Sequence, residues 1–217
     1  MSTVLLVRHG QAQWYAEDYD QLSELGIEQS LETGRALAEL VTPSVVISGG
    51  QERQKHTAAL AVEAAGWQLP VEVEPGWSEF DHRQVLAAHE VEPPADPEGA
   101  PGEYAAWFQA ALRRWADGGN EADYDVPFPG FTSRIDVELR RLGESLEPSQ
   151  AAVVFTSGGP ICWSVTTLLG GQPELWLRLA PVVVNVGITR LSVSPRGMRL
   201  WTFNEHSHLH PGSVSVR

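Results

Sequence analysis

The chain has 217 residues, of which 42% are hydrophobic and 20% charged, a composition typical of folded globular proteins and not of disordered ones. This length favours a single domain over residues 1–217. Its 15 Lys and Arg residues stand against 28 Asp and Glu residues, which gives a net charge of −13. Such an acidic surface repels phosphate backbones and anionic lipids, so we expect neither nucleic acids nor membranes as partners.

The sequence also indicates where the protein resides. Its one cysteine, Cys162, excludes a disulfide within the chain, as expected in a reducing compartment. No apolar run reaches the roughly 18–20 residues that cross a bilayer, and residues 1–8 lack the pattern of a secretory signal. We therefore expect a cytoplasmic protein in which Cys162 is a buried, inert thiol.

The first part of the chain alternates predicted strands and helices. The strands, which are short apolar or alternating runs, cover residues 4–7, 45–48 and 71–74. The helices cover about 23–40 and 51–65, and Ser23 is a good N-cap for the first of them. The order strand, helix, strand, helix predicts an α/β fold with a largely parallel sheet.

A proline-rich loop over 92–102 is followed by two apolar stripes with helical spacing. The first stripe consists of Tyr104, Trp107, Phe108, Ala111, Leu112 and Trp115, and the second of Phe131, Ile135, Leu139, Leu142 and Leu146. We interpret both stripes as core and not as ligand-binding surface. Because α/β patterns flank this stretch on both sides, residues from about 92 to 147 are interpreted as a helical insertion.

The α/β pattern then resumes to the end of the chain. Further strands are predicted over 151–156, 186–193 and 198–203, and further helices over 158–169 and 173–179. The whole pattern predicts three layers, with helices on both faces of the sheet.

Polar or glycine-rich residues follow three of the predicted strands. They are Arg8-His9-Gly10-Gln11, Ser48-Gly49-Gly50 with Arg53 shortly after, and Thr156-Ser157-Gly158-Gly159. Ligands of α/β sheets collect at the carboxyl ends of strands. Two arginines with glycine-rich turns make an oxyanion site, because the guanidinium matches phosphate geometry and glycine lets backbone amides approach. A neutral imidazole in such a site is a nucleophile suited to phosphorus.

Four segments resemble motifs of the histidine phosphatase superfamily. In chain order they are Arg8-His9-Gly10, residues 22–29, residues 48–58 and Trp77-Ser78-Glu79. The similarity covers almost the whole chain, and four motifs in family order are a specific signal, whereas a lone Arg-His-Gly is not. The resemblance implies a phosphoglycerate mutase-like fold, a three-layer α/β/α sandwich with a mostly parallel sheet.

The resemblance also implies roles for these residues. His9 is the nucleophile that becomes phosphohistidine. Glu79 donates a proton to the leaving oxygen and later activates water as a base. Arg8 and Arg53 bind the phosphoryl oxygens and stabilise the transition state. No metal or cofactor is implied, and the expected partner is a small phosphomonoester that the protein hydrolyses.

The chain departs from the family at the fourth strand end, where a second histidine usually precedes Gly-Gly and this chain has Ser157-Gly158-Gly159. Three interpretations stay open. Ser157 takes over the phosphate contact with Gly158, or His82, three residues after Glu79, brings an imidazole from another loop. Alternatively, activity is weak or absent and the domain binds phosphorylated ligands. A purely structural role for Ser157 is to cap the next helix.

Hydrolysis is favoured over mutase chemistry. The mutases usually carry Arg-His-Gly-Glu and an asparagine seven residues beyond the arginine, where this chain has Gln11 and Tyr15. Substrate choice is assigned to the insertion, whose aromatic residues are expected to shape a pocket lid. The residues considered for this lid are Trp107, Trp115, Phe128 and Phe131.

Several other polar residues receive mainly structural interpretations. Asp81 lies two residues after Glu79 and is an alternative acid. His206, His208 and His210 alternate and would face one side of an extended segment, but we expect a solvated or capping role and not metal binding. The tryptophans and the late apolar strands leave room for a homodimer.

Overall fold

The structure is a computed structural model and describes residues 1–13, 20–96 and 99–216. Its centre is a six-stranded sheet with the order β3-β2-β4-β1-β5-β6. The strands are β1 (Ser2–Arg8), β2 (Val45–Ser48), β3 (Val71–Val73), β4 (Ala151–Thr156), β5 (Ile188–Ser194) and β6 (Gly197–Glu205). Parallel pairing joins β3, β2, β4 and β1, whereas β5 runs antiparallel to β1 and β6 antiparallel to β5. The mostly parallel sheet is thus confirmed, and β3 lies at its edge.

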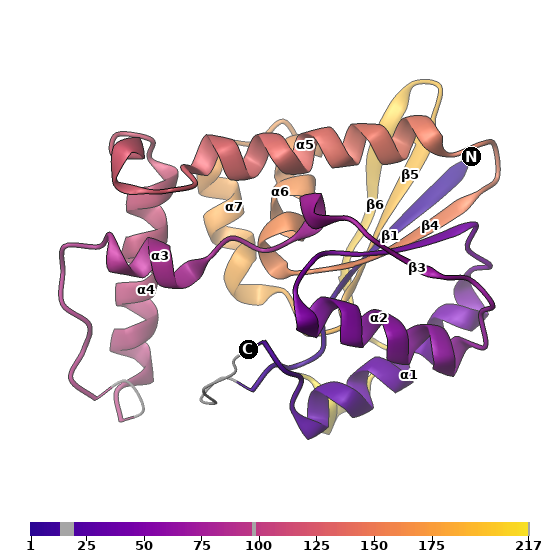
Figure 1. Ribbon diagram of the computed structural model, residues 1–217, viewed down its shortest axis with the longest axis horizontal. Helices are drawn as coiled ribbons and strands as arrows, with labels where there is room; N and C mark the ends of the chain where they lie inside the picture. Colours follow the sequence, from indigo (N-terminus) through magenta and orange to yellow (C-terminus); the bar gives the residue numbers. More distant parts are fainter. Residues whose placement is uncertain (14–19, 97–98, 217) are drawn as a thin grey trace.

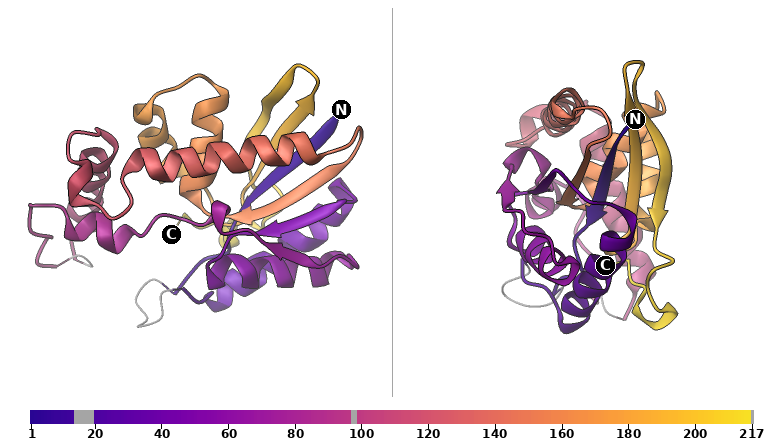
Figure 2. Two further views of the ribbon diagram at one scale, coloured as in Figure 1. Left: turned by 45° about the horizontal axis from the view of Figure 1, so that its top comes forward. Right: turned by 90° about the vertical axis from the view of Figure 1, so that its right-hand side faces the viewer.

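Helices cover both faces of this sheet. They are α1 (Glu24–Leu40), α2 (Glu52–Ala65), α3 (His82–Ala87), α4 (Pro101–Ala116), α5 (Phe128–Ser145), α6 (Gly158–Leu168) and α7 (Pro173–Leu179). Figures 1 and 2 place the pair α1–α2 and the long helix α5 on opposite sides of the strands. Ser23 caps α1 as expected, because its side chain accepts a hydrogen bond from the Gly26 amide. The predicted three layers are confirmed.

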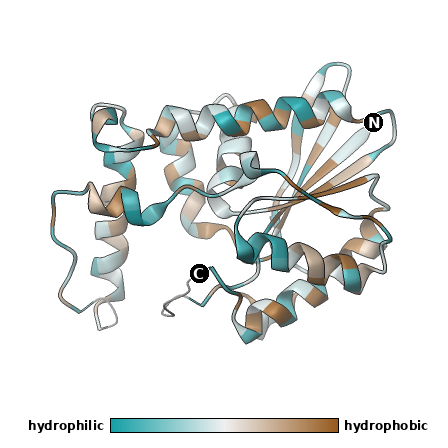
Figure 3. Cartoon of the chain, in the orientation of Figure 1, coloured by the Kyte–Doolittle hydropathy of each residue, from teal (hydrophilic) through white to brown (hydrophobic). Residues whose placement is uncertain are grey.

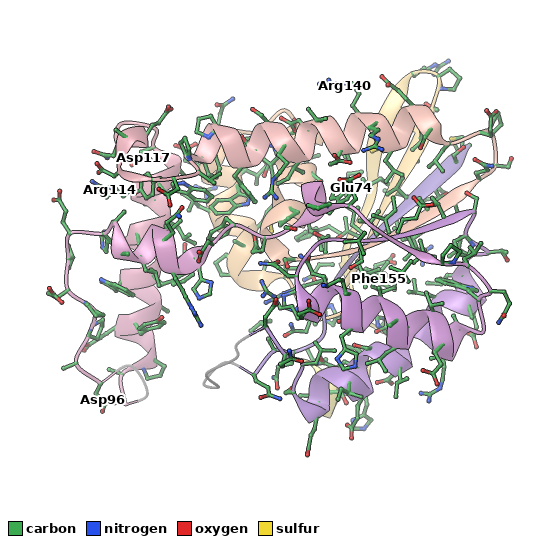
Figure 4. All side chains as sticks on the ribbon, viewed as in Figure 1. Glu74, Asp96, Arg114, Asp117, Arg140 and Phe155 are labelled. Atoms are coloured by element: carbon green, nitrogen blue, oxygen red, sulfur yellow. The ribbon has the colours of Figure 1, made fainter. Side chains whose placement is uncertain are left out.

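The two faces of the sheet hold two separate cores because successive strand residues point to opposite sides. In β1, Leu5 and Val7 pack toward α1 and α2, whereas Val4 and Leu6 belong to the larger core beneath α5 and α6. Phe155 of β4 lies on the α2 side, where Figure 4 labels it. Figure 3 shows apolar colour along the strands and mixed polar and apolar residues along α1 and α5. Such helices bury one side and solvate the other.

The stretch predicted as one insertion has two structurally different parts. Helix α5 packs on α6 and on the short 3-10 helix η1 (Pro75–Trp77), so it forms part of the layer over the sheet. Helix α4 instead packs on α3 and α7 at one end of the molecule (Figure 1). The short helix α3 was not predicted, because its six residues carry too little periodicity to be recognised.

No helix within the described ranges is both long and apolar enough to cross a membrane.

Candidate active site

Three strand ends meet at one edge of the sheet. Strands β2, β4 and β1 are parallel neighbours, so their carboxyl ends bring Ser48, Thr156 and Arg8 side by side. The fourth segment arrives from β3, because η1 follows this strand and leads directly to Glu79. Strand order and direction therefore bring together the three polar strand ends found in the sequence and the segment that carries Glu79.

His9 follows β1 and is only 3% exposed. The Arg53 Nε–H donates to His9 Nε2 over 3.1 Å, and His9 Nδ1 lies 2.7 Å from the Gly10 carbonyl oxygen. Because Nε2 accepts a hydrogen bond, it carries a lone pair, and the ring proton is on Nδ1, which donates to Gly10. The side chain is thus a neutral imidazole with its nucleophilic nitrogen aimed at a guanidinium.

Burial lowers the pKa of His9 well below the usual range for histidine, and the positive charges of Arg53 and Arg8 lower it further. The hydrogen bond to the Gly10 carbonyl only partly opposes this shift. The imidazole therefore stays neutral near neutral pH. Its backbone is fixed as well, since the Asn185 side-chain amide donates to the His9 carbonyl over 3.2 Å.

Arg53 is held from two sides. It lies in the first turn of α2 and is 4% exposed. Its Nη1 forms a 2.6 Å ion pair with Asp20 Oδ1, while its Nε faces His9. The second oxygen of Asp20 accepts from the Glu52 amide over 2.8 Å, so the same carboxylate caps α2. Arg8 donates from Nη1 to the Val183 carbonyl.

Glu79 is gripped by backbone amides. The Gly159 N–H donates to Oε2 over 2.8 Å, and the Phe80 N–H donates to Oε1 over 3.1 Å. Burial raises the pKa of Glu79 and outweighs these hydrogen bonds and the nearby guanidinium of Arg53, which lower it. A carboxyl group with a raised pKa can hold a proton and return it, as a general acid and base must.

These side chains line a cavity of about 400 Å³, a volume typical of small-molecule sites. One part, here called the charged floor, consists of Arg8, His9, Arg53, Glu79 and His82. The other part, here called the apolar wall, consists mainly of Phe80, Tyr104, Phe108, Leu112, Trp176 and Pro181. The cavity therefore joins an anion-binding end to an apolar end.

Ser157 does not line this cavity. It is fully buried, and its Oγ accepts a 2.7 Å hydrogen bond from Gln54 Nε2. Although Ser157 is the N-cap residue of α6, its side chain makes no capping hydrogen bond. The next two residues, Gly158 and Gly159, do line the cavity. The turn therefore presents Gly158 and Gly159 to the cavity, and not the Ser157 hydroxyl.

His82 lies where the second of the open interpretations needs it. It begins α3, lines the cavity and is half-buried. Burial and the charge of Arg53 lower the pKa of His82, so its imidazole is neutral near neutral pH. Asp81 instead accepts from the Arg83 amide and caps α3. Of the two carboxylates, only Glu79 lines the cavity.

The expected lid of four aromatic residues is wrong. Trp115, Phe128 and Phe131 are buried in the core beneath α5, and Trp107 donates to the Val91 carbonyl outside the cavity. The prediction that the first stripe is only core is also wrong. Three of its members line the cavity, namely Tyr104, Phe108 and Leu112.

The remaining candidates have structural surroundings. Burial raises the pKa of the Cys162 thiol, which disfavours the reactive thiolate. His210 caps a 3-10 turn by accepting from the Gly212 amide. His208 contacts the Thr33 hydroxyl, and His206 contacts the carbonyl of Asn204. Within the described ranges, no three metal-ligating side chains cluster. The mutase-related position Tyr15 lies outside the described residues.

Sequence patterns missed three residues that shape the site. Asp20 pairs with Arg53, Gln54 binds Ser157, and Asn185 holds the His9 carbonyl. Gln54 carried a weak signal, since it follows Arg53 in the first turn of a helix whose preceding loop is glycine-rich. Asp20 and Asn185 act from other segments, so nothing local indicates their partners.

Comparisons with known proteins show the family and agree with the fold. Residues 4–206 match the family description "histidine phosphatase superfamily (branch 1)". The chain is 23% identical to the uncharacterized phosphatase PhoE of Bacillus subtilis, over 96% of this chain and 97% of that protein. It resembles the structure of a phosphoglycerate mutase from Bacillus anthracis, with a TM-score of 0.70 and 17% identity over 95% of this chain and 94% of that one. A phosphoserine phosphatase from Entamoeba histolytica gives a TM-score of 0.69 and 18% identity over 97% and 100% of the two chains.

Proposed function

Because the chain belongs to the histidine phosphatase superfamily, we propose that it hydrolyses a small phosphomonoester through a phosphohistidine on His9. The observation that supports this most strongly is the tautomer of His9. Its Nδ1 proton is committed to the Gly10 carbonyl, so the lone pair of Nε2 faces Arg53. A phosphoryl group bound between the two would take the Arg53 donor for its own oxygen and meet the lone pair at phosphorus.

In the first step, His9 Nε2 attacks phosphorus and forms an N–P bond while the ester P–O bond breaks. Glu79 supplies the proton that the departing alkoxide needs, since burial raises its pKa and favours the protonated acid. Arg8 and Arg53 stabilise the charge on the phosphoryl oxygens. The products are a free alcohol and phosphohistidine.

In the second step, Glu79 is a carboxylate and takes a proton from water. The oxygen of this water attacks phosphorus, the N–P bond breaks, and inorganic phosphate leaves. His9 and Glu79 then return to their starting protonation states. The Gly159 and Phe80 amides hold the carboxylate throughout.

We assign the phosphate contacts to Arg8, Arg53, the Gly158 turn and His82. The position of Ser157 supports this assignment, because its hydroxyl is fully buried and engaged with Gln54. His82 lines the cavity next to Arg53. A neutral imidazole there supplies a hydrogen-bond donor, though not a positive charge.

The test is phosphate release from a panel of phosphomonoesters that includes 4-nitrophenyl phosphate, comparing the native protein with His9→Ala. We expect release that disappears in the variant, because His9 is the imidazole whose Nε2 lone pair faces Arg53. Release that persists at the native rate in His9→Ala overturns the phosphohistidine route.

The second candidate is a module that binds phosphorylated ligands without turnover, and the loss of the imidazole at Ser157 favours it. Phosphate binding that depends on Arg53, with no release from any panel member, would support this candidate. Mutase activity is a weaker alternative. Phosphoryl transfer between two hydroxyls of one substrate, outpacing release to water, would establish it.

We also propose a cellular location for this activity. The single cysteine and its buried setting suit a reducing compartment, so we place the activity in the cytoplasm. Cell fractionation checks this, and recovery in an oxidising compartment would contradict it.

A further inference from the structure

The two parts of the cavity differ sharply in charge. Along the described part of the chain, every Asp, Glu, Lys, Arg or His side chain that lines the cavity belongs to the charged floor. Arg8, Arg53, His9 and Glu79 are all engaged with the phosphoryl group in the proposed reaction. His82 is the one other titratable member, and its lowered pKa leaves it neutral near neutral pH.

The apolar wall is formed by large side chains from three directions. Tyr104, Phe108 and Leu112 lie at i, i+4 and i+8 of α4, so they form one stripe along a single face of this helix. Trp176 of α7 and Phe80, which follows Glu79, lie on the same cavity. Figure 1 shows α4 and α7 beyond the carboxyl ends of the strands.

Two aromatic residues of this wall, Phe80 and Trp176, are held in place by packed rings and a hydrogen bond. Phe80 contacts Trp115 with ring centroids 4.8 Å apart and Trp176 at 6.0 Å. The Trp176 indole N–H donates to the Gly159 carbonyl over 3.0 Å, which fixes this ring against the turn that holds Glu79. The wall is therefore a formed apolar surface beside the reacting centre.

A charged group on the substrate's alcohol would find poor partners at this wall. Among the described residues, the uncharged polar side chains that line the cavity there are Tyr104 and Gln109. A carboxylate or ammonium that loses water without a counter-charge is strongly disfavoured. An aromatic or branched aliphatic group, in contrast, gains from burial against the rings.

We propose that the preferred substrates are phosphomonoesters of uncharged, apolar alcohols, whose aromatic or aliphatic part lies against Phe80, Phe108, Leu112 and Trp176. This inference rests on the proposed phosphatase activity and specifies its substrate class. It predicts poor use of small, charged phosphomonoesters such as phosphoserine.

The test compares two primary alkyl phosphates, 2-phenylethyl phosphate and O-phosphoserine. Both release a primary alkoxide, so their difference in kcat/KM reports mainly how the rest of the molecule binds. We expect at least about a tenfold preference for the phenylethyl ester, the scale that apolar contacts in a pocket supply. Equal rates, or a preference for phosphoserine, would overturn the inference while leaving the phosphatase function intact.

A pair of variants on α4 locates the effect. Phe108→Ala removes one ring of the apolar wall and should lower the phenylethyl-to-phosphoserine ratio of kcat/KM about tenfold. Arg113→Ala changes an exposed residue of the same helix and should leave both values as in the native protein. A ratio that Phe108→Ala does not move shows that the alcohol lies elsewhere, and Phe108→Leu, which keeps a bulky apolar side chain, repeats the test if the alanine variant fails to fold.

Failure of the two claims can be told apart. Absence of any His9-dependent release from either ester contradicts both the proposed function and the inference. His9-dependent release without the apolar preference contradicts the inference alone. His9-dependent release with the preference, lost on Phe108→Ala, supports both.

Discussion

The charged floor and the apolar wall of the cavity are built in different ways. His9 and Glu79 lie close to the buried ends of strands and are fixed by hydrogen bonds from other segments, such as those of Arg53 and Gly159. The wall depends largely on α4, a helix at one end of the molecule whose cavity-facing rings of Tyr104 and Phe108 are half-buried. The floor thus fixes the chemistry, whereas the part of the wall on α4 can vary without disturbing it.

The largest effect should come from removing the acid of the floor. Glu79→Gln keeps the shape but has no proton to donate, so we expect kcat/KM for 2-phenylethyl phosphate, which reports the first step, to fall about 10²–10⁴-fold. With 4-nitrophenyl phosphate the loss should be much smaller, because this leaving group departs without protonation. Steady-state kinetics on the two substrates check this, and equal losses on both would show that Glu79 is not the acid.

The pH dependence should follow from the same two groups. The first step needs neutral His9 and protonated Glu79, and the pKa of His9 is lowered while that of Glu79 is raised. Above the pKa of Glu79, kcat/KM on an alkyl phosphate should fall about tenfold per pH unit. It should also fall below the pKa of His9, where the nucleophile becomes protonated.

This assignment can be contradicted directly. The optimum should lie between the pKa of His9 and the pKa of Glu79, and the alkaline fall should be absent in Glu79→Gln measured on 2-phenylethyl phosphate. Since the substrate is the same for both proteins, its own ionisation cancels in the comparison. An identical alkaline limb in the variant would assign that limb to another group.

Two neighbouring glycines beside the charged floor, Gly158 and Gly159, offer a matched pair of substitutions. A Cβ added at Gly159 would lie 2.0 Å from Glu79 Oε1, whereas one at Gly158 would have Arg8 Nε as its nearest neighbour at 3.9 Å. Gly159→Ala should therefore displace the carboxylate and lower kcat about a hundredfold, as misplacement of a reacting group by about 1 Å does. Gly158→Ala should cost clearly less. Similar losses from both would show that the turn itself, and not Glu79, is what the substitution disturbs.

The smallest effects should come from substitutions of His82 and Ser157, the two residues considered as replacements for the second histidine of the family. His82→Ala removes a donor that lines the cavity, and we expect kcat/KM to fall about tenfold, less than for a charged donor. Ser157→Ala should alter kcat/KM less while lowering the melting temperature, because it leaves the buried Gln54 amide short of a partner. Circular dichroism melts with kinetics on both variants check this, and the reverse ranking in kcat/KM would return the phosphate contact to Ser157.

The sequence predicted the floor much better than the wall, for a physical reason. Strand ends of a parallel sheet meet at one edge, so motifs that follow β1, β2 and β4 come together whatever the details of packing. His82 was found for the same reason, since it follows Glu79 closely. The buried position of Ser157 depends on Gln54, a residue of another helix, and no local pattern encodes that contact.

The wall shows what periodicity leaves undetermined. The stripe on α4 predicted a buried face, and Leu112 and Trp115 are indeed buried. Tyr104 and Phe108 continue the same stripe but face the cavity. An aromatic residue satisfies the helical period equally well against a core or against a ligand pocket, so spacing alone cannot distinguish them. The exposed side of α5 was easier to recognise from the helical period. Arg140 lies on that side and points away from the sheet (Figure 4).

The central claim is that His9 carries the phosphoryl group between the two steps, and trapping this intermediate tests it most directly. The native protein would be mixed with 4-nitrophenyl phosphate, quenched in alkali, which preserves phosphohistidine, and analysed by intact-protein and peptide mass spectrometry. The account predicts one added phosphoryl group on the peptide that contains His9 and none in His9→Ala. Turnover with no phosphorylated enzyme, together with undiminished release by His9→Ala, would contradict it.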